Sequence, residues 1–187
     1  MLKDIIKREL PRHLSDATAI VSLANPTYAV LEMMAGMTVG VSLNSRAIST
    51  AITYAGLASL TKIRDFSKRK IGITEESAEW KKGLHDVLFT GTAVLGLKPV
   101  IYWMSGETDW RKIAIATVAT AAAGAVMGYP GGYLIDSYRE VFGVEENGRL
   151  PDMIKNQSPT VQKGLAAVVT VGSVGAVAAV YAVAQNL

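Results

Sequence analysis

IAIATVATAAAGAVMGYPGGYLI, residues 113–135, contains no charged side chain over its 23 positions. Residues 165–187 form a second uncharged stretch of the same length. A helix that crosses a lipid bilayer needs about 20 mostly apolar residues. Neither stretch has the polar face that a helix on the outside of a soluble bundle needs. Both stretches therefore predict membrane-spanning helices.

Three further stretches carry one charge each: residues 17–40 contain Glu32, residues 39–61 contain Arg46, and residues 87–106 contain Lys98. All five stretches are rich in alanine and show no alternation of polar and apolar positions, which favours helices over barrel strands. We therefore expect an all-α membrane protein. Its predicted spans are at about 17–37, 42–61, 86–105, 113–135 and 164–185. The alternative is a soluble helical bundle, which needs polar outer faces on most of its helices.

The composition argues against several functional classes. The chain has 187 residues, no cysteine and two histidines, so a disulfide framework or a thiolate metal site is impossible and a catalytic metal centre is not expected. A net charge of +3 is too small for a dedicated nucleic-acid binder. No nucleophile–base set is apparent, so we expect neither an enzyme nor a cofactor.

The lysines and arginines predict the orientation. Fifteen of them fall in the N-terminal tail and in the connections after the second and fourth spans, whereas the opposite side has Arg46, Arg111 and Lys112. Cytoplasmic loops carry the excess of these residues, which places the N-terminus in the cytoplasm and the C-terminus outside the inner membrane. Residues 1–13 place apolar side chains on one face and predict an amphipathic helix on the inner leaflet; a frayed terminus is the alternative.

The two halves of the chain resemble each other. Matching segments recur at offsets of 70 and 71 residues: Leu14-Ser15-Asp16 with Leu84-His85-Asp86, Met34-Ala35-Gly36 with Met104-Ser105-Gly106, Asp65 with Asp136, and Ile71-Gly72-Ile73 with Phe142-Gly143-Val144. Each half, 14–73 and 84–144, holds two spans, so both halves run in the same direction through the membrane. We therefore expect a four-span core of two parallel repeats over 14–144, with 145–187 adding a loop and a fifth span.

Small residues recur every four positions in the fourth span, at Gly124, Gly128 and Gly132. Small residues at this spacing let helix backbones approach closely where lipid supplies no hydrophobic drive for association. We interpret these glycines as a helix-packing ridge.

Polar groups at depth mark the candidate transport site. Lys98 lies near the middle of the third span and precedes Pro99, while Asn25 and Pro26 lie at a similar depth in the first span. Ionisable groups inside a bilayer are functional candidates by default, and paired proline interruptions point to a binding site. Glu32 lies nearer the outer face, where it either pairs with Lys98 or reaches outer water. The alternative reading is two kinks, a snorkelling lysine and a solvated acid.

Four aspartates fall at the cytoplasmic ends of the predicted spans. Asp16 and Asp86 are expected to start helices, where a carboxylate can cap free N–H groups. Asp65 and Asp136 end helices and need cationic partners, of which Arg64 and Arg139 are nearest in sequence. The four aspartates form either a structural ring of ion pairs or a cytoplasmic gate that breaks and reforms.

Several motifs together resemble one transporter family. They are Ser42-Leu43-Asn44-Ser45-Arg46 followed by Arg64-Asp65; Trp110, Met127-Gly128, Gly132-Tyr133, Asp136, Arg139, Phe142 and Val144; and Asp16 with Ala19 and Asp86 with Pro99. Over residues 14–144 the chain resembles the small bacterial L-alanine exporters. Residues 145–187 have no counterpart in that pattern.

The resemblance implies a transporter that exports a small neutral amino acid such as L-alanine, driven by the proton gradient. Four or five spans are few for a solute path, which favours a homodimer. A membrane scaffold or assembly protein is the alternative. Lys98 and Glu32 distinguish the two, because a scaffold has little reason to bury them.

Overall fold

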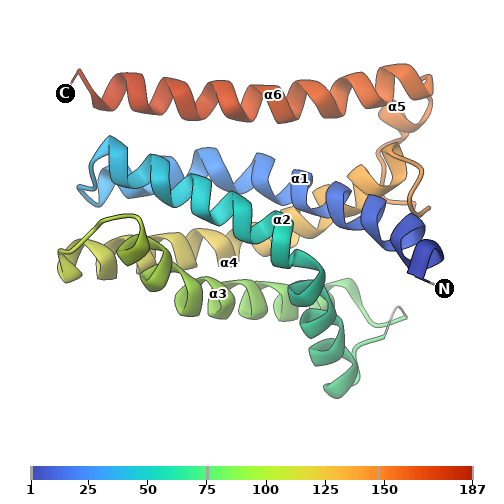
Figure 1. Ribbon diagram of the computed structural model, residues 1–187. Coiled ribbons are helices and arrows are strands. Elements are labelled where there is room, and N and C mark those ends of the chain that lie inside the picture. Colours follow the sequence, from blue (N-terminus) through green and yellow to red (C-terminus); the bar gives the residue numbers. More distant parts are fainter. Residues whose placement is uncertain (1, 75, 147, 187) are drawn as a thin grey trace.

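The computed structural model describes residues 2–74, 76–146 and 148–186, with side chains except at 2–8, 57–59, 61 and 129. Five long helices and one short one form the described chain (Figure 1): α1 Leu2–Met34, α2 Val39–Lys70, α3 Glu79–Met104, α4 Trp110–Val141, α5 Asp152–Lys155 and α6 Pro159–Ala184. No strand occurs among these residues. The prediction of an all-α protein is confirmed.

The five predicted spans lie in α1, α2, α3, α4 and α6. Among the described residues, α3 and α6 are long and apolar enough to cross a membrane. A third span is added if the halves of α4, Trp110–Gly128 and Pro130–Val141, count as one despite a bend of 55°. A proline inside a helix removes a backbone donor and bends the axis. The structure thus supports two or three membrane spans, and the count of five stays a prediction.

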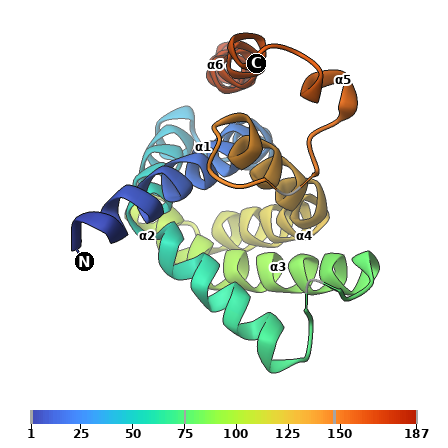
Figure 2. The same ribbon diagram turned by 90° about the vertical axis from the view of Figure 1, so that its right-hand side faces the viewer.

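The first four helices pack together, and α6 lies outside them against α1. Figure 2 shows α6 nearly end-on, separated from α2 and α3, with the second half of α2 leaning away from α1. Residues 2–13 belong to the same helix as the residues that follow them, because α1 continues through Pro11 to Met34. The side chains before Glu9 lie outside the described part, so the placement of this segment on a lipid surface stays a prediction.

The first four helices end in the same way. Gly36, Gly72, Gly106 and Gly143 follow them with φ of +79°, +73°, +98° and +67°. One residue further on, a backbone N–H returns to a carbonyl of the last helical turn, as in Ile73 N to Lys68 O at 2.9 Å and Val144 N to Arg139 O at 2.8 Å. This hydrogen bond defines a Schellman motif, whose left-handed position favours glycine. The local helix ends therefore repeat, while the repeat of whole halves stays a prediction.

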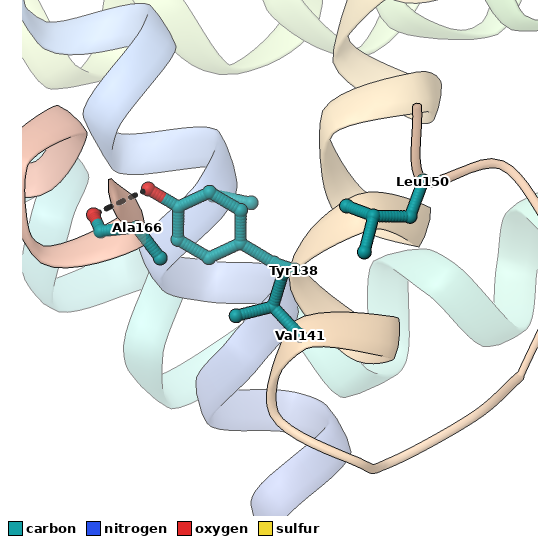
Figure 3. Packing of buried hydrophobic residues seen from close by; sticks show 5 residues of the cluster. Tyr138, Val141, Leu150 and Ala166 are labelled. Carbon is teal, nitrogen blue, oxygen red and sulfur yellow. Dashed lines mark hydrogen bonds between the residues drawn. The ribbon is translucent and has the colours of Figure 1, made fainter. Parts of the chain in front are cut away.

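Burial is inverted relative to a soluble protein. Val126 and Val171 are 75% and 71% exposed, whereas Asp16, Glu32, Arg46 and Lys98 are buried. Apolar cores are small: one cluster joins Ala19, Tyr138, Val141, Leu150 and Ala166, and Figure 3 shows Tyr138 reaching from α4 to α6. An apolar exterior around a polar interior fits a protein surrounded by lipid.

α4 approaches the backbone of α3 at Gly128. A Cβ atom at this position would lie 2.9 Å from the carbonyl oxygen of Asp86 and 3.1 Å from the nitrogen of Val87. At Gly124 a Cβ would lie 2.8 Å from the Tyr28 hydroxyl, whereas at Gly132 the nearest atom is 3.8 Å away. α4 therefore approaches its neighbours most closely at Gly124 and Gly128, and less closely at Gly132.

Two expectations about helix ends and prolines are wrong. Asp16 and Asp86 cap no helix, because Asp16 lies inside α1 and α3 begins at Glu79, with no side-chain cap from Ala78. The helices extend past the apolar stretches, so these aspartates bond to cations instead of free N–H groups. Pro26 and Pro99 do not interrupt α1 and α3, which remain continuous helices.

Candidate functional site

A buried carboxylate forms the centre of the site. Glu32, near the end of α1, is fully buried. Ser42, Ser45 and Arg46 share one face of α2, because residues three and four apart lie above one another on a helix. Ser42 Oγ donates to Glu32 Oε2 at 2.6 Å and Ser45 Oγ donates to Oε1 at 3.1 Å. Arg46 Nη2 forms an ion pair with Oε1.

Lys98 joins this cluster from α3. Its Nζ lies 3.8 Å from Glu32 Oε1 and donates to Ser49 Oγ at 3.2 Å. The ammonium lies 4.7 Å from the ring centroid of Tyr28 and 5.2 Å from that of Tyr102, close enough for cation–π attraction. The structure therefore brings together Glu32 and Lys98, and both side chains are buried, with Lys98 4% exposed.

The cluster contains two basic side chains and one carboxylate, and Arg46 keeps unused donors. Nε and Nη1 of Arg46 are buried with no hydrogen-bond partner in the described part of the chain. Arg46 and Lys98 both line a cavity of about 240 Å³, with Asn25, Tyr28 and Ser49 beside them. A buried donor without a partner is costly, and a guanidinium matches the two oxygens of a carboxylate. The cavity wall can therefore bind an anionic group such as a carboxylate.

The cavity continues toward the opposite end of the helices. Its wall there includes Arg64, Asp86 and Arg139. Arg64 and Arg139 also line a second, more polar cavity of about 180 Å³, together with Arg12, Asp16 and other residues near the start of α1. The two cavities thus adjoin at these two arginines.

Ion pairs at this junction connect helices that are distant in sequence. Arg139 Nε on α4 donates to Asp16 Oδ1 on α1 at 2.6 Å. Arg64 Nε on α2 donates to Asp86 Oδ1 on α3 at 2.8 Å, and Lys68 Nζ lies 2.8 Å from the same oxygen. Burial lowers the pKa of the Lys68 ammonium below its ordinary value, against the opposing effect of its hydrogen bond to Asp86.

The remaining two aspartates contact the arginines nearest to them in sequence, and both arginines also pair with aspartates on other helices. Arg64 reaches across to Asp86, and its Nη1 lies 3.9 Å from the exposed Asp65. Asp136 lies 3.6 Å from Arg139 Nη1 and 3.1 Å from Arg149 Nη1. The interhelical partner is favoured because residues adjacent in a helix point in different directions.

Of the other predicted site residues, Asn25 lines the cavity and donates through Nδ2 to Thr50 Oγ1 at 3.1 Å. Pro26 and Pro99 do not line it. No group of three potential metal-ligating side chains occurs among the described residues.

The most important residue that the predicted site omitted is Arg46. The charge distribution predicts that Arg46 lies on the outer side of the membrane, yet Arg46 lies inside α2 and pairs with Glu32. The signal was present in Ser42-Leu43-Asn44-Ser45-Arg46, where three polar side chains fall on one helical face. Tyr181, on α6, contacts Ser42 at 2.9 Å and had no such signal.

Apolar helices that enclose a charged cluster and a cavity define the class: a multi-pass membrane protein of the transporter type. The family comparison agrees, because residues 5–145 match the model described as "AlaE: L-alanine exporter". The chain belongs to this L-alanine exporter family. Comparison with curated proteins and with solved structures finds no match. AlaE is a transporter family and not an enzyme family, and membership does not favour a scaffold role.

Proposed function

We propose that this protein exports L-alanine and similar small neutral amino acids across the cytoplasmic membrane, driven by the inward proton gradient. The observation that carries the proposal is the buried Glu32 carboxylate, which pairs with Arg46 and Lys98, the two basic residues that line a cavity. Membership of the exporter family supports the substrate class.

Competition between the substrate and a proton for Glu32 gives the coupling. On the inner side the carboxylate of the amino acid binds Arg46 and Lys98, and its ammonium group binds the ionised Glu32. On the outer side a proton from outside neutralises Glu32, which then no longer attracts the ammonium group, and the substrate leaves. The site returns to the inner side without substrate, and Glu32 releases its proton to the cytoplasm because Arg46 and Lys98 favour the ionised carboxylate. One binding site thus alternates between substrate and proton.

Export from vesicles tests this function. Proteoliposomes loaded with labelled L-alanine should release it faster than protein-free vesicles. An imposed gradient that drives protons in the opposite direction to alanine should increase the release severalfold, and a protonophore should abolish that increase. Release equal to that of protein-free vesicles would reject the proposed function, and release without any effect of the gradient would reject the coupling.

The ion pairs between the two cavities serve as the cytoplasmic gate. Each connects one half of the chain to the other: Asp16 with Arg139, and Asp86 with Arg64 and Lys68. Asp16 and Asp86 are 70 residues apart, and Lys68 and Arg139 are 71 residues apart, the same offsets as the repeat. This exchange of partners supports two parallel repeats, and a path from the cytoplasm to Arg46 must pass these pairs.

Breaking the gate at Asp16 and Arg139 should impair export. Arg139→Gln leaves the buried Asp16 without its partner, which costs about 3–5 kcal/mol, whereas Asp16→Asn removes the shortest ion pair of Arg139 but leaves it beside Asp136 and Glu145. We expect each to reduce export at least about tenfold, and the exchanged pair Asp16→Arg with Arg139→Asp to regain a substantial part of it. Glu79→Gln, which removes an exposed pair with Arg149, should retain export because such pairs contribute about 0–1 kcal/mol. Failure of the exchanged pair to exceed either single variant would contradict the gate.

We further propose a cytoplasmic N-terminus, an outer C-terminus and five spans, assembled as a homodimer around the transport path. The start of α1 and the end of α6 lie at opposite ends of the molecule, as an odd number of spans requires (Figure 1).

Single cysteines test the orientation cleanly because the chain has none of its own. Asn186→Cys should react with an impermeant maleimide added to intact cells, and Lys70→Cys only after the cells are opened. The reversed pattern would overturn the orientation, and labelling of both from outside would rule out the three spans predicted between these two positions.

A further inference from the structure

One polar side chain of α6 reaches the charged cluster. Tyr181 lies near the end of this largely apolar helix and is 8% exposed. Its hydroxyl lies 2.9 Å from Ser42 Oγ, which itself lies 2.6 Å from Glu32 Oε2. The three groups therefore form a hydrogen-bonded chain from α6 through α2 to α1.

The direction of donation in this chain follows from the chemistry of the groups. An ionised carboxylate only accepts hydrogen bonds, so Ser42 uses its single hydroxyl hydrogen for Glu32. Ser42 Oγ can then only accept, and the Tyr181 hydroxyl must donate to it. A hydroxyl that accepts a hydrogen bond is polarised by it and donates a stronger hydrogen bond of its own. Tyr181 thus strengthens the hold of Ser42 on the Glu32 carboxylate.

α6 packs mainly along α1, and Tyr181 connects it to the charged cluster. A Cβ at Gly164, Gly172 or Gly175 would meet no atom within 4 Å, so none of these glycines makes a close helix contact. Among the described residues, the other hydrogen bonds between α6 and the first four helices bypass Glu32: the Tyr138 hydroxyl bonds to Ala166 O at 3.1 Å (Figure 3) and to Thr170 Oγ1 at 3.1 Å, and Ser22 bonds to Thr170 at 3.4 Å. α6 also lies beyond residue 145, where the family match ends.

We infer that Tyr181 is a positioning residue for Glu32, so that α6, outside the residues matched to the family, forms a working part of the transport site. It acts through Ser42 and holds the carboxylate in the geometry that Arg46 and Lys98 require. The inference rests on the proposed function for its role in transport, but not for its effect on Glu32.

Two tyrosine variants form the matched test. Tyr181→Phe and Tyr138→Phe each remove one hydroxyl that connects α6 to the core, but only the first removes a bond that leads to Glu32. We expect similar, small changes in melting temperature for both. In alanine-loaded vesicles, Tyr181→Phe should raise the half-saturating alanine concentration about threefold to tenfold, the value of one hydrogen bond. Tyr138→Phe should leave it unchanged, and equal behaviour of the two variants in transport would overturn the inference.

A second measurement needs no transport. A hydrophobic carbodiimide modifies protonated carboxyl groups in apolar surroundings, and mass spectrometry measures its rate at Glu32. Tyr181→Phe should increase this rate severalfold over the wild-type protein and over Tyr138→Phe, because the charged carboxylate loses support. An unchanged rate would reject Tyr181 as a positioning residue even in an active exporter. Absence of alanine export by the wild-type protein would reject only the proposed function.

A double-mutant cycle tests the route through Ser42. If Tyr181 acts through this hydroxyl, Tyr181→Phe should add no further change in labelling rate in a Ser42→Ala background. Additive changes would show that Tyr181 affects Glu32 by another route and would overturn the proposed chain.

Discussion

Lys98→Met should reduce alanine export about 10- to 150-fold while the protein remains folded. Methionine keeps the length of the side chain and removes the basic group that faces the cavity. The loss of one charge-assisted hydrogen bond to a substrate carboxylate costs about 1.5–3 kcal/mol, which corresponds to that range in affinity. Initial rates of labelled alanine efflux over a range of internal concentrations measure the effect.

The fold should tolerate this change because Glu32 keeps its other partners. Ser42, Ser45 and Arg46 still donate to its carboxylate. Removing the buried Lys98 charge therefore leaves no carboxylate unpaired and can even stabilise the protein. Lys163→Met, an exposed position in α6, is the control and should export normally. Normal export by Lys98→Met would show that Lys98 lies outside the substrate path.

Gly128→Leu should cause the largest loss of stability. Its Cβ would lie 2.9 Å from the backbone oxygen of Asp86, and the backbone cannot move aside as a flexible side chain does. α3 and α4 must then separate at the residue that binds Arg64 and Lys68. Overpacking typically costs about 1–3 kcal/mol, and the loss of these ion pairs adds to it. The melting temperature and the monodisperse fraction in detergent should both fall.

Gly175→Leu is the matched control. Gly175 is also helical, but no atom lies within 4 Å of its Cβ position, so leucine can extend freely. Gly128→Ala should fall between the two, because one methyl group already meets the backbone of α3. Equal tolerance of leucine at both positions would show that the contact at Gly128 does not hold the helices together.

The positions of the helices followed from the distribution of charges, while their lengths did not. Long uncharged stretches located α1 to α4 and α6, because burial in lipid excludes charges over the width of the bilayer. The helices extend past these stretches at Asp16, Arg64 and Arg139 because paired ions stabilise helical turns outside the apolar region. Pairing between helices depends on how they pack, which sequence spacing does not describe.

The candidate site was predicted in part for a similar reason. Lys98 and Glu32 were visible as single charges in apolar stretches. Arg46 was also visible, but its place near a predicted loop suggested contact with water. Only the packing of α2 against α1 shows that Arg46 faces Glu32. Only the packing of α6 beside the first four helices brings Tyr181 to Ser42.

The two ends of the helices are connected by chain segments of very different length. Residues 35–38 and 105–109 join α1 to α2 and α3 to α4, whereas residues 71–78 and 142–158 make the connections at the other end. A chain reaches at most about 3.3–3.6 Å per residue, so the short turns hold their helix ends together covalently. Helices can part mainly at the other end, where the connections are long and ion pairs join the helices. Added salt screens accessible charges over about 8–10 Å, so ionic strength on the side of Arg139 should set how readily that end opens.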